Sequence, residues 1–352
     1  MAFPEVPTES RSKINKAGDI LRDPSADLDS LTTALDLAER WRACHSYPIN
    51  TFQAHLRTKL KLYHKDAIAA QRLKRMPTIV DKLKRYPSMP LATMQDIGGL
   101  RAIMPSVKEA IKLAEDYRAN HRLLHALVDD KDYIHNPRDA DGYRSIHLIW
   151  KYANIRAPRY NGLRIELQIR SKLQHTWATA VETMGTLLGQ ALKSRQGDKE
   201  WLDFFALVSS AFAHKEGTPP VPRFSHLGYS ETCNAIRAAE KKLTALDKMK
   251  AFSVAVQSIS KNKAIQTGSS FHLIVLNSIK RTVQVRSYDR ANLQKALDDY
   301  SSVEKEASRG DSVEPVLVGA GSVNNIRKAY PNFFLDIGGF IRLITDMTAG
   351  TK

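Results

Sequence analysis

Two acidic residues, Asp96 and Glu166, could hold a divalent metal ion. Asp96 lies in Asp96-Ile-Gly-Gly-Leu-Arg101, where the paired glycines allow the backbone to approach a ligand closely. Glu166 lies in Leu163–Arg170, whose alternation sends one set of side chains to a single face: Arg164, Glu166, Gln168 and Arg170. Phosphoryl or diphosphoryl transfer requires a metal held by carboxylates and cations around the phosphates. Asp96 could equally be a turn or cap residue, and the polar strand face could equally face water.

A turn-rich loop, 132–147, runs into an expected strand and carries a candidate aromatic platform. Gly142 frees the backbone just before Tyr143, and a ring held at a loop rim can stack on a nucleic acid base. Ser145 and His147 would follow it on the same strand face. Tyr143 could also be a packing residue, and His147 a structural histidine.

The chain is strongly basic, with a formal net charge of +16 over 352 residues, which indicates an anionic partner such as phosphate. Residues 57–85 contain ten Lys and Arg against only Asp66 and Asp81. A solvated helix face is the alternative, but such faces usually interleave both signs. We therefore interpret the stretch as a surface that faces phosphates.

The elements that must position these residues alternate between helices and a few strands. Apolar spacing predicts helices at 27–43, 49–70, 106–121 and 171–188 and strands at 100–104, 143–152 and 163–170. This order favours an α+β or mixed α/β sheet covered by helices.

Successive prolines within Glu216–Pro222 indicate a linker before a second, small α+β unit. We expect helices at 231–249, 290–307 and 322–329 and strands at 251–258, 271–277, 282–286 and 314–318. The predicted domains are a helical region 1–50, a catalytic domain 51–215, the linker 216–228 and a carboxy-terminal domain 229–352.

Several protein classes are disfavoured. No apolar run reaches the length of a membrane helix, and the amino terminus does not resemble a secretory signal, so a soluble cytoplasmic protein without membrane contact is expected. The two cysteines, Cys44 and Cys233, lie far apart without CxxC spacing, so neither a disulfide framework nor a thiolate zinc site is expected.

Six motifs, in order along the chain, resemble the synthetase domain of RelA/SpoT alarmone enzymes. They are Arg72-x-Lys74, Thr78-Ile79-x-x-Lys82-x-x-Arg85, Asp96-Ile-x-Gly-x-Arg101, Asp132-Tyr-Ile, Gly142-Tyr-Arg-Ser-Ile-His147 and Glu166-Leu-Gln-Ile-Arg170. The resemblance covers about residues 50–215 and implies an α+β fold with a nucleotidyltransferase-like mixed sheet flanked by helices. No hydrolase domain precedes it, so the chain is similar to the small, synthesis-only members.

The resemblance implies a role for each matching residue. Asp96 and Glu166 would hold Mg²⁺, and Glu166 would also take the proton of the acceptor hydroxyl. The ATP-binding residues would be Arg72 and Arg101, stacked on adenine, with Lys74, Thr78, Lys82 and Arg85 near the phosphates. The acceptor-binding residues would be Tyr143, Ser145, His147, Gln168 and Arg170. The family often has Lys-Asn before Gly-Tyr, whereas Arg138 and Ala140-Asp141 stand here.

The carboxy-terminal part resembles the trailing domain of CapRel-type fused toxin–antitoxin alarmone-synthetase relatives. The matching stretches are Arg290-Ala-Asn, Glu314–Val318, Ser322–Arg327 and Ala329–Asp336. In that family two tyrosines cover the ATP adenine site; here Tyr330 matches and Phe333 replaces the second, which implies weaker autoinhibition. The resemblance also implies phage defence, with a phage protein acting on this domain as the trigger.

Three functions follow as hypotheses. The first is a toxic, translation-inhibiting enzyme that transfers pyrophosphate from ATP to the 3′-terminal adenosine of tRNA, with Lys59, Lys61 and Lys65 as tRNA-binding residues. The second is a (p)ppGpp synthetase that uses GTP or GDP as the acceptor. The third is a non-catalytic RNA-binding regulatory module, which the intact pair Asp96 and Glu166 disfavours.

Overall fold

A computed structural model describes residues 3–74, 76–120, 123–188, 198–261, 271–277, 282–308, 313–319 and 333–349. The chain divides into two compact units. The first unit contains Met1–Asn136 and Arg144–Lys172, and the second contains Pro137–Tyr143 and Leu173–Lys352. Each unit has its own apolar core, and the two are described separately.

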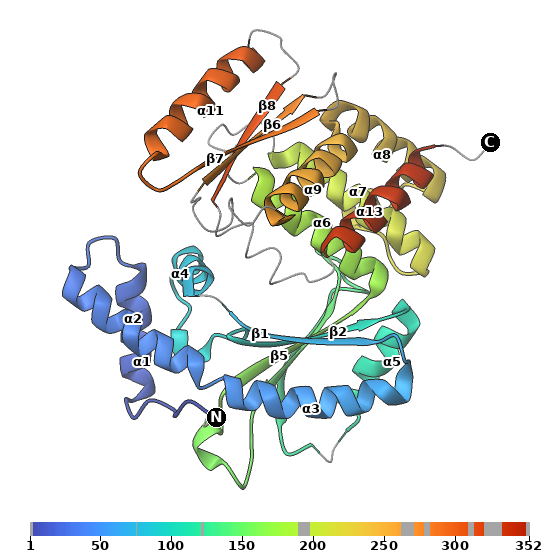
Figure 1. The fold of residues 1–352 in the computed structure, drawn as a ribbon. Helices are drawn as coiled ribbons and strands as arrows, with labels where there is room; N and C mark the ends of the chain where they lie inside the picture. The colour runs from blue at the N-terminus through green and yellow to red at the C-terminus, as the bar shows by residue number, and fades with distance from the viewer. Residues whose placement is uncertain are drawn as a thin grey trace. The chain divides into compact units, whose positions relative to one another are not determined.

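The first unit is built on a mixed five-stranded sheet in the order β1-β2-β5-β4-β3 (Figure 1). The strands are β1 (Ile68–Leu73), β2 (Gly98–Met104), β3 (Ala126–Asp132), β4 (Ile146–Lys151) and β5 (Arg164–Ser171). β2 and β5 are parallel and every other pair is antiparallel. The expectation of a mixed sheet in an α+β fold is confirmed.

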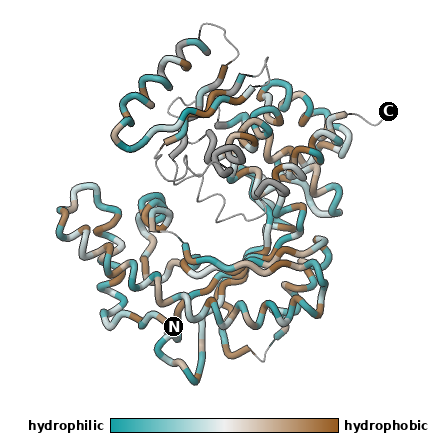
Figure 2. The backbone as a smooth tube through the Cα atoms, viewed as in Figure 1, coloured by the Kyte–Doolittle hydropathy of each residue, from teal (hydrophilic) through white to brown (hydrophobic). Residues whose placement is uncertain are grey.

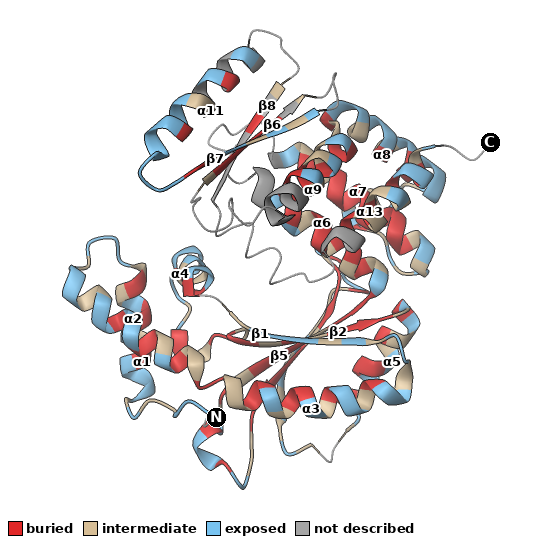
Figure 3. Ribbon diagram, in the orientation of Figure 1, coloured by how far each residue is buried: buried red, intermediate tan, exposed pale blue. Residues whose placement is uncertain are grey.

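Alternation along β5 separates an apolar from a polar face. Ile165, Leu167 and Ile169 are fully buried in a core shared with the helices α3 (Ser46–Tyr63) and α5 (Val107–Arg118) (Figure 3). A Cβ atom on Gly98 would lie 2.8 Å from Ile165 Cδ1 and 3.1 Å from Ile49 Cγ1, so α3 packs closely against this face. Glu166 and its polar neighbours therefore occupy the opposite face of the sheet.

Three further helices complete the unit: α1 (Arg11–Arg22), α2 (Leu28–Ala43) and α4 (Met76–Arg85). α4 buries Met76, Ile79 and Leu83, which is the i, i+3, i+7 spacing of an amphipathic helix. The helix expected at 27–43 corresponds to α2, and α1 packs on α4.

Several expected elements of this unit were wrong in detail. The helix predicted at 49–70 ends at Tyr63, because His64 is extended (φ −161°, ψ 136°), and the chain continues into β1. β3 was not anticipated, because its exposed and charged residues are typical of an edge strand. β4 begins only at Ile146, so Tyr143 and Ser145 do not share its alternation with His147.

The second unit joins helices to a three-stranded antiparallel sheet of order β7-β6-β8 (Figure 1). Figure 2 colours the backbone by hydropathy in the same view. The helices are α6 (Lys172–Leu188), α7 (Asp198–Glu216), α8 (Tyr229–Leu243), α9 (Ala245–Lys261), α11 (Leu293–Ser308) and α13 (Phe333–Thr348). The strands are β6 (Phe271–Asn277), β7 (Thr282–Tyr288) and β8 (Val313–Gly319). A small α+β region at the carboxy terminus was therefore correctly expected.

One predicted element of this unit is wrong, and another lies in a part of the chain that the structure does not describe. The strand expected at 251–258 is part of helix α9, whose buried residues Ala245, Met249, Phe252 and Ala255 recur at helical spacing. The helix expected at 322–329 lies outside the described residues.

The proline-rich segment packs onto α7. Val221 is fully buried and its amide donates to Ser210 Oγ at 3.1 Å, while the amide of Thr218 donates to the carbonyl of Ala213 at 3.0 Å. The two compact units meet in sequence at Lys172–Leu173, so α6 and α7 group with the carboxy-terminal part.

Candidate active site

Strand pairing brings polar residues from all five strands onto one face of the first unit's sheet. His147 on β4 pairs with Gln168 on β5, which pairs with Arg101 on β2. Lys131 on β3 extends this row beyond His147. In the adjacent row, Glu166 pairs with Gly99, and Gly99 pairs with Arg72 on β1. Residues far apart in sequence thus share one surface, which we call the polar face.

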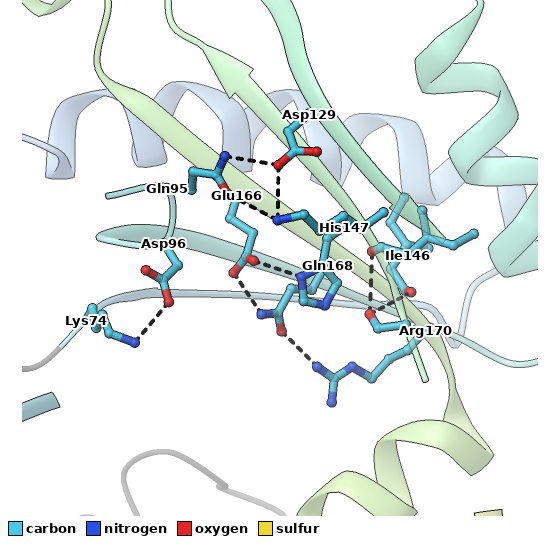
Figure 4. A network of polar contacts seen from close by, with 12 residues as sticks. Lys74, Gln95, Asp96, Asp129, Ile146, His147, Glu166, Gln168 and Arg170 are labelled. Carbon is cyan, nitrogen blue, oxygen red and sulfur yellow. Dashed lines mark hydrogen bonds and ion pairs between the residues drawn. The ribbon is translucent and has the colours of Figure 1, made fainter. Parts of the chain in front are cut away.

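Glu166 lies at the centre of a hydrogen-bonded chain (Figure 4). Its Oε1 is 2.9 Å from His147 Nδ1, and its Oε2 accepts a hydrogen bond from Gln168 Nε2 at 2.8 Å. Arg170 in turn donates to Gln168 Oε1 at 2.7 Å, which fixes the orientation of the amide. Glu166 is 8% exposed, so these contacts replace water around the carboxylate.

The charge state of Glu166 follows from opposing effects. Burial raises its pKa, and the nearby charge of Asp96 acts in the same direction. The hydrogen bonds and charge supplied by His147 and Gln168 outweigh both, so the pKa of Glu166 lies below its ordinary value. The carboxylate is therefore ionised at neutral pH.

Asp96, at the entry to β2, is held by two lysines. Lys74 Nζ lies 2.9 Å from Asp96 Oδ2, and Lys82 Nζ lies 2.9 Å from Asp96 Oδ1 (Figure 4 draws the Lys74 contact). Burial raises the pKa of Asp96, but the two ammonium charges outweigh it and leave the pKa below the usual range. The site thus combines an ionised carboxylate with two cations of predicted phosphate-binding function.

Helices α1 and α2 hold the segment that carries these lysines. Arg42 Nε on α2 donates to the carbonyl of Lys74 at 2.7 Å, and the amide of Lys74 donates to the carbonyl of Ile97 at 2.8 Å. At the other end of α4, Arg22 on α1 donates to the carbonyls of Tyr86, Pro87 and Met89. The ends of the lysine-bearing segment are therefore anchored by arginines.

Three polar residues at the site were not anticipated. Gln95 Nε2 donates to Asp129 Oδ2 at 3.0 Å, and Lys131 Nζ lies 3.0 Å from the same oxygen (Figure 4 draws Gln95 and Asp129). The negative charge of Glu166 is among the causes that raise the pKa of Lys131, although burial opposes them. The alternation of Asp129 and Lys131 just before the Asp132-Tyr motif was the available signal.

The remaining predicted ATP-binding residues lie on strands β1 and β2 and on helix α4. Arg72 is exposed at the edge of the sheet, and Arg101 is half-buried beside Gln168. Thr78 and Arg85 are exposed on α4, at either end of that helix. These placements are compatible with contacts to a bound nucleotide, which stay predictions.

Two predicted acceptor residues lie in settings that differ from expectation. Ser145 is fully buried and its hydroxyl donates to the carbonyl of Ile169 at 3.0 Å, so an acceptor would have to replace that bond. Tyr143 belongs to the second unit and is half-buried, with the Arg138 guanidinium 5.0 Å from its ring centroid. Its ring also meets that of Trp177 edge-on at 6.4 Å.

The predicted tRNA-binding lysines lie on or just after α3, the helix that covers the apolar face. Lys59 is 2.9 Å from Asp116 Oδ2 and lies over the ring of Tyr117, so it is already engaged. Lys61 and Lys65 are exposed. Of the predicted autoinhibitory pair, Tyr330 lies outside the described residues, and Phe333 begins α13 without a described side chain.

The carboxylates fit a magnesium ion in number and type. Mg²⁺ is usually bound by one or two carboxylates, with water and substrate phosphates completing the shell. Asp96 and Glu166 are near enough for the charge of one to raise the pKa of the other. Within the part of the chain that the structure describes, no group of three or more metal-ligating side chains occurs. Nor does any helix in those ranges have the length and apolarity needed to cross a membrane.

Comparison with known proteins places these residues in a recognised region. Residues 71–184 match the family model described as "Region found in RelA / SpoT proteins". Uncharacterized proteins from Mycobacterium tuberculosis and Mycobacterium bovis are 31% identical over 130 residues, 36% of this chain. The chain spans only 43% of the length of these curated relatives.

Two solved structures match about half of the chain, each with a TM-score below 0.5. Small alarmone synthetase 1 from Bacillus subtilis, bound to its product pppGpp, matches at 23% identity and a TM-score of 0.42 over 51% of this chain and 92% of that one. A GTP pyrophosphokinase family protein from Streptococcus pneumoniae matches at 22% identity and a TM-score of 0.40 over 49% and 87%.

Proposed function

We propose that residues 71–184 form a RelA/SpoT synthetase domain. On this premise the chain transfers the β,γ-diphosphate of ATP to the 3′-hydroxyl of an acceptor nucleotide. One observation supports this most strongly. The carboxylates Asp96 and Glu166 and the ammonium groups of Lys74 and Lys82 gather at one end of the polar face. Acidic metal ligands beside cations that can bind phosphate are the parts that phosphate transfer needs.

The ATP side of the site consists of Lys74 and Lys82, with Thr78 and Arg85 on the same helix as Lys82. In the proposed complex these groups neutralise the transferring phosphates, while Arg72 and Arg101 stack on adenine. Mg²⁺ held by Asp96 and Glu166 would supply charge stabilisation on the phosphate oxygens.

The transfer forms a bond between the acceptor 3′-oxygen and the β-phosphorus and breaks the bond between that phosphorus and the oxygen linking it to the α-phosphate. AMP leaves, and the proton of the acceptor hydroxyl passes to the Glu166 carboxylate. Glu166 is ionised and so accepts a hydrogen bond from that hydroxyl, which orients it for attack. Its low pKa makes it a weak base, which suits a loose transition state in which the proton departs late.

We propose the 3′-terminal adenosine of tRNA as the acceptor. The support comes from the loop before β4, where the Arg138 guanidinium is paired with the Asp141 carboxylate and stacked on Tyr143. An arginine engaged in this way is poorly placed to receive the 5′-phosphates of a small guanosine nucleotide. A polyanionic acceptor also matches the net charge of +16. Synthesis of (p)ppGpp from GTP or GDP is the competing outcome.

The test is incubation of the protein and Mg²⁺ with γ-³²P-ATP and deacylated tRNA, GDP or GTP, followed by separation of the products. Label should pass to tRNA, and Asp96→Asn or Glu166→Gln should abolish the transfer. Asp130→Asn is the matched control, because Asp130 pairs with Arg118 away from the polar face. No transfer to any acceptor under these conditions would refute the proposed function.

We further propose, from the CapRel-type resemblance, that the carboxy-terminal part restrains the enzyme until a partner such as a phage protein binds it. A tethered inhibitor acts at an effective concentration near millimolar, so weak docking suffices. Tyr330→Ala in the full chain should then raise the transfer rate and toxicity in cells. Equal rates for the variant and the wild-type chain would argue against restraint by this residue.

A further inference from the structure

The loop Pro137–Tyr143, which carries the proposed acceptor-stacking ring, has a defined internal conformation within the second unit. The amide of Gly142 donates to the carbonyl of Arg138 at 2.8 Å, and the amide of Tyr143 donates to Asp141 Oδ1 at 3.1 Å. Gly142 has φ +79°, a conformation that favours glycine. The turn therefore sets the direction in which Tyr143 leaves the loop.

Helix α7 supports this turn directly. Ser209 Oγ donates to the carbonyl of Gly142 at 2.5 Å. A Cβ atom on Gly142 would lie 2.8 Å from Ser209 Cβ and 2.9 Å from Ala206 Cα, so the loop backbone rests on the helix. This contact joins segments 67 residues apart in sequence.

Arg223, just after the proline-rich segment, holds the other side of the loop. Its amide donates to Asp139 Oδ1 at 2.9 Å, and its NH1 donates to the carbonyls of Asp139 at 2.6 Å and Ala140 at 3.4 Å. Its NH2 donates to Asp203 Oδ1 on α7 at 2.8 Å. The guanidinium thus bridges α7 and the loop backbone.

The segment that carries Arg223 is itself fixed. Val221, two residues earlier, is fully buried, and its amide is bound by Ser210 Oγ. The Arg223 side chain is 28% exposed, so its contacts are partly shielded from water. Hydrogen bonds from a charged donor are the stronger kind, and two of them end on loop carbonyls.

We propose that Arg223 is a positioning residue for acceptor binding, which holds residues 139–140 so that Tyr143 presents its ring to the acceptor base. This inference rests on the proposed function and on the predicted acceptor-binding role of Tyr143. Arg223 lies outside the matched residues 71–184, so the acceptor specificity of the domain depends on the segment that follows α7. Tyr143 precedes His147 by four residues in the chain, so the held loop leads directly into β4.

The first experiment measures steady-state kinetics of the full chain with deacylated tRNA and with GDP as acceptors. Arg223→Ala should raise the acceptor KM about tenfold, because it removes about one hydrogen bond from a charged donor to the loop. The KM for ATP should stay unchanged. Arg223→Lys keeps the positive charge and a hydrogen-bond donor but cannot bridge two partners as a guanidinium does. It should therefore have an acceptor KM between those of the wild type and Arg223→Ala. Lys242→Ala is the control, because it removes a surface ion pair with Glu200 in the same unit.

A second measurement does not depend on turnover. Hydrogen exchange of the amides of residues 138–143 should quicken in Arg223→Ala and stay unchanged in Lys242→Ala, without any substrate present. If Arg223→Ala does not fold, Asp203→Asn serves instead, because it removes the partner that orients the guanidinium. Quicker exchange confined to the loop supports the proposal.

Tyr143→Ala distinguishes failure of the positioning role of Arg223 from failure of the acceptor-binding role of the loop. If it raises the acceptor KM and Arg223→Ala leaves both that KM and loop exchange at wild-type values, the positioning role is wrong and the proposed function stands. If neither variant alters acceptor use, the acceptor role of the loop fails together with the inference.

Discussion

The ion pairs between Asp96 and the two lysines predict that metal and ATP favour each other's binding, because the metal competes with the lysines for Asp96 and the ATP phosphates compete with Asp96 for the lysines. In the structure each carboxylate oxygen has an ammonium group 2.9 Å away. A divalent ion that binds Asp96 without ATP must displace at least one lysine. With ATP present, the phosphates take over the lysines and leave the carboxylate to the metal. Lys74→Met should therefore tighten metal binding and weaken ATP binding.

The size of the effect follows from the geometry. At 2.9 Å and an effective dielectric constant of about 20, the gross attraction is roughly 6 kcal/mol. Desolvation of both groups offsets most of it, because the side chains of Lys74 and Asp96 are only 14% and 21% exposed. A net change of about 1.4 kcal/mol, tenfold in affinity, is the expected remainder.

The assay measures Mn²⁺ binding to the ATP-free protein by electron paramagnetic resonance and binding of a non-hydrolysable ATP analogue by calorimetry. Lys74→Met should bind Mn²⁺ about tenfold more tightly and the analogue at least tenfold more weakly. Lys84→Met removes an exposed lysine on α4 and should change neither affinity. A fall in both affinities, or an unchanged Mn²⁺ affinity, would refute the proposed exchange of partners.

Four further predictions follow from individual contacts. Because the native pKa of Glu166 lies below its ordinary value of 4.5, the ionised carboxylate stabilises the fold at pH values above 4.5. This stability is lost as the pH falls through the lower native pKa, so below about pH 4.5 the Tm of the wild type should drop more than that of Glu166→Gln. Gly142→Ala should destabilise the loop by about 1–3 kcal/mol, seen as quicker hydrogen exchange at 138–143, because the new Cβ would meet Ser209 and Ala206. Arg42→Ala should weaken binding of the ATP analogue and Arg40→Ala on the same helix should not, since only Arg42 bonds the carbonyl of Lys74. If tRNA is the acceptor, charge reversal of Lys61 and Lys65 should flatten the salt dependence of tRNA modification by about one unit of log–log slope per contact, and an unchanged slope would assign them to solubility.

The sequence predicted the positions of the candidate residues best where a local pattern determines the structure. Strict alternation in β5 was enough to place Glu166, Gln168 and Arg170 on the face opposite to the apolar Ile165 and Leu167. The glycine pair after Asp96 likewise indicated a strand entry, and β2 begins at Gly98. These inferences needed no knowledge of distant contacts.

The features that were missed depend on contacts between distant segments. The pairing of β1 with β2 turns an expected helix end into an edge strand, and no pattern within Ile68–Leu73 reveals it. Gln95 reaches Asp129 across 34 residues, and Arg223 reaches Asp139 across 84. Ser145 was expected to face the acceptor because the strand was taken to begin at Tyr143, whereas β4 begins at Ile146.

The most direct test of the central claim identifies the bond in ATP that is broken. The full chain should be incubated with Mg²⁺, α-³²P-ATP and the acceptor that receives γ-label, and the labelled nucleotide should be resolved from ATP. Diphosphate transfer predicts labelled AMP in a one-to-one ratio with modified acceptor, and no AMP from Glu166→Gln. Labelled ADP in place of AMP would show transfer of a single phosphoryl group and contradict the account.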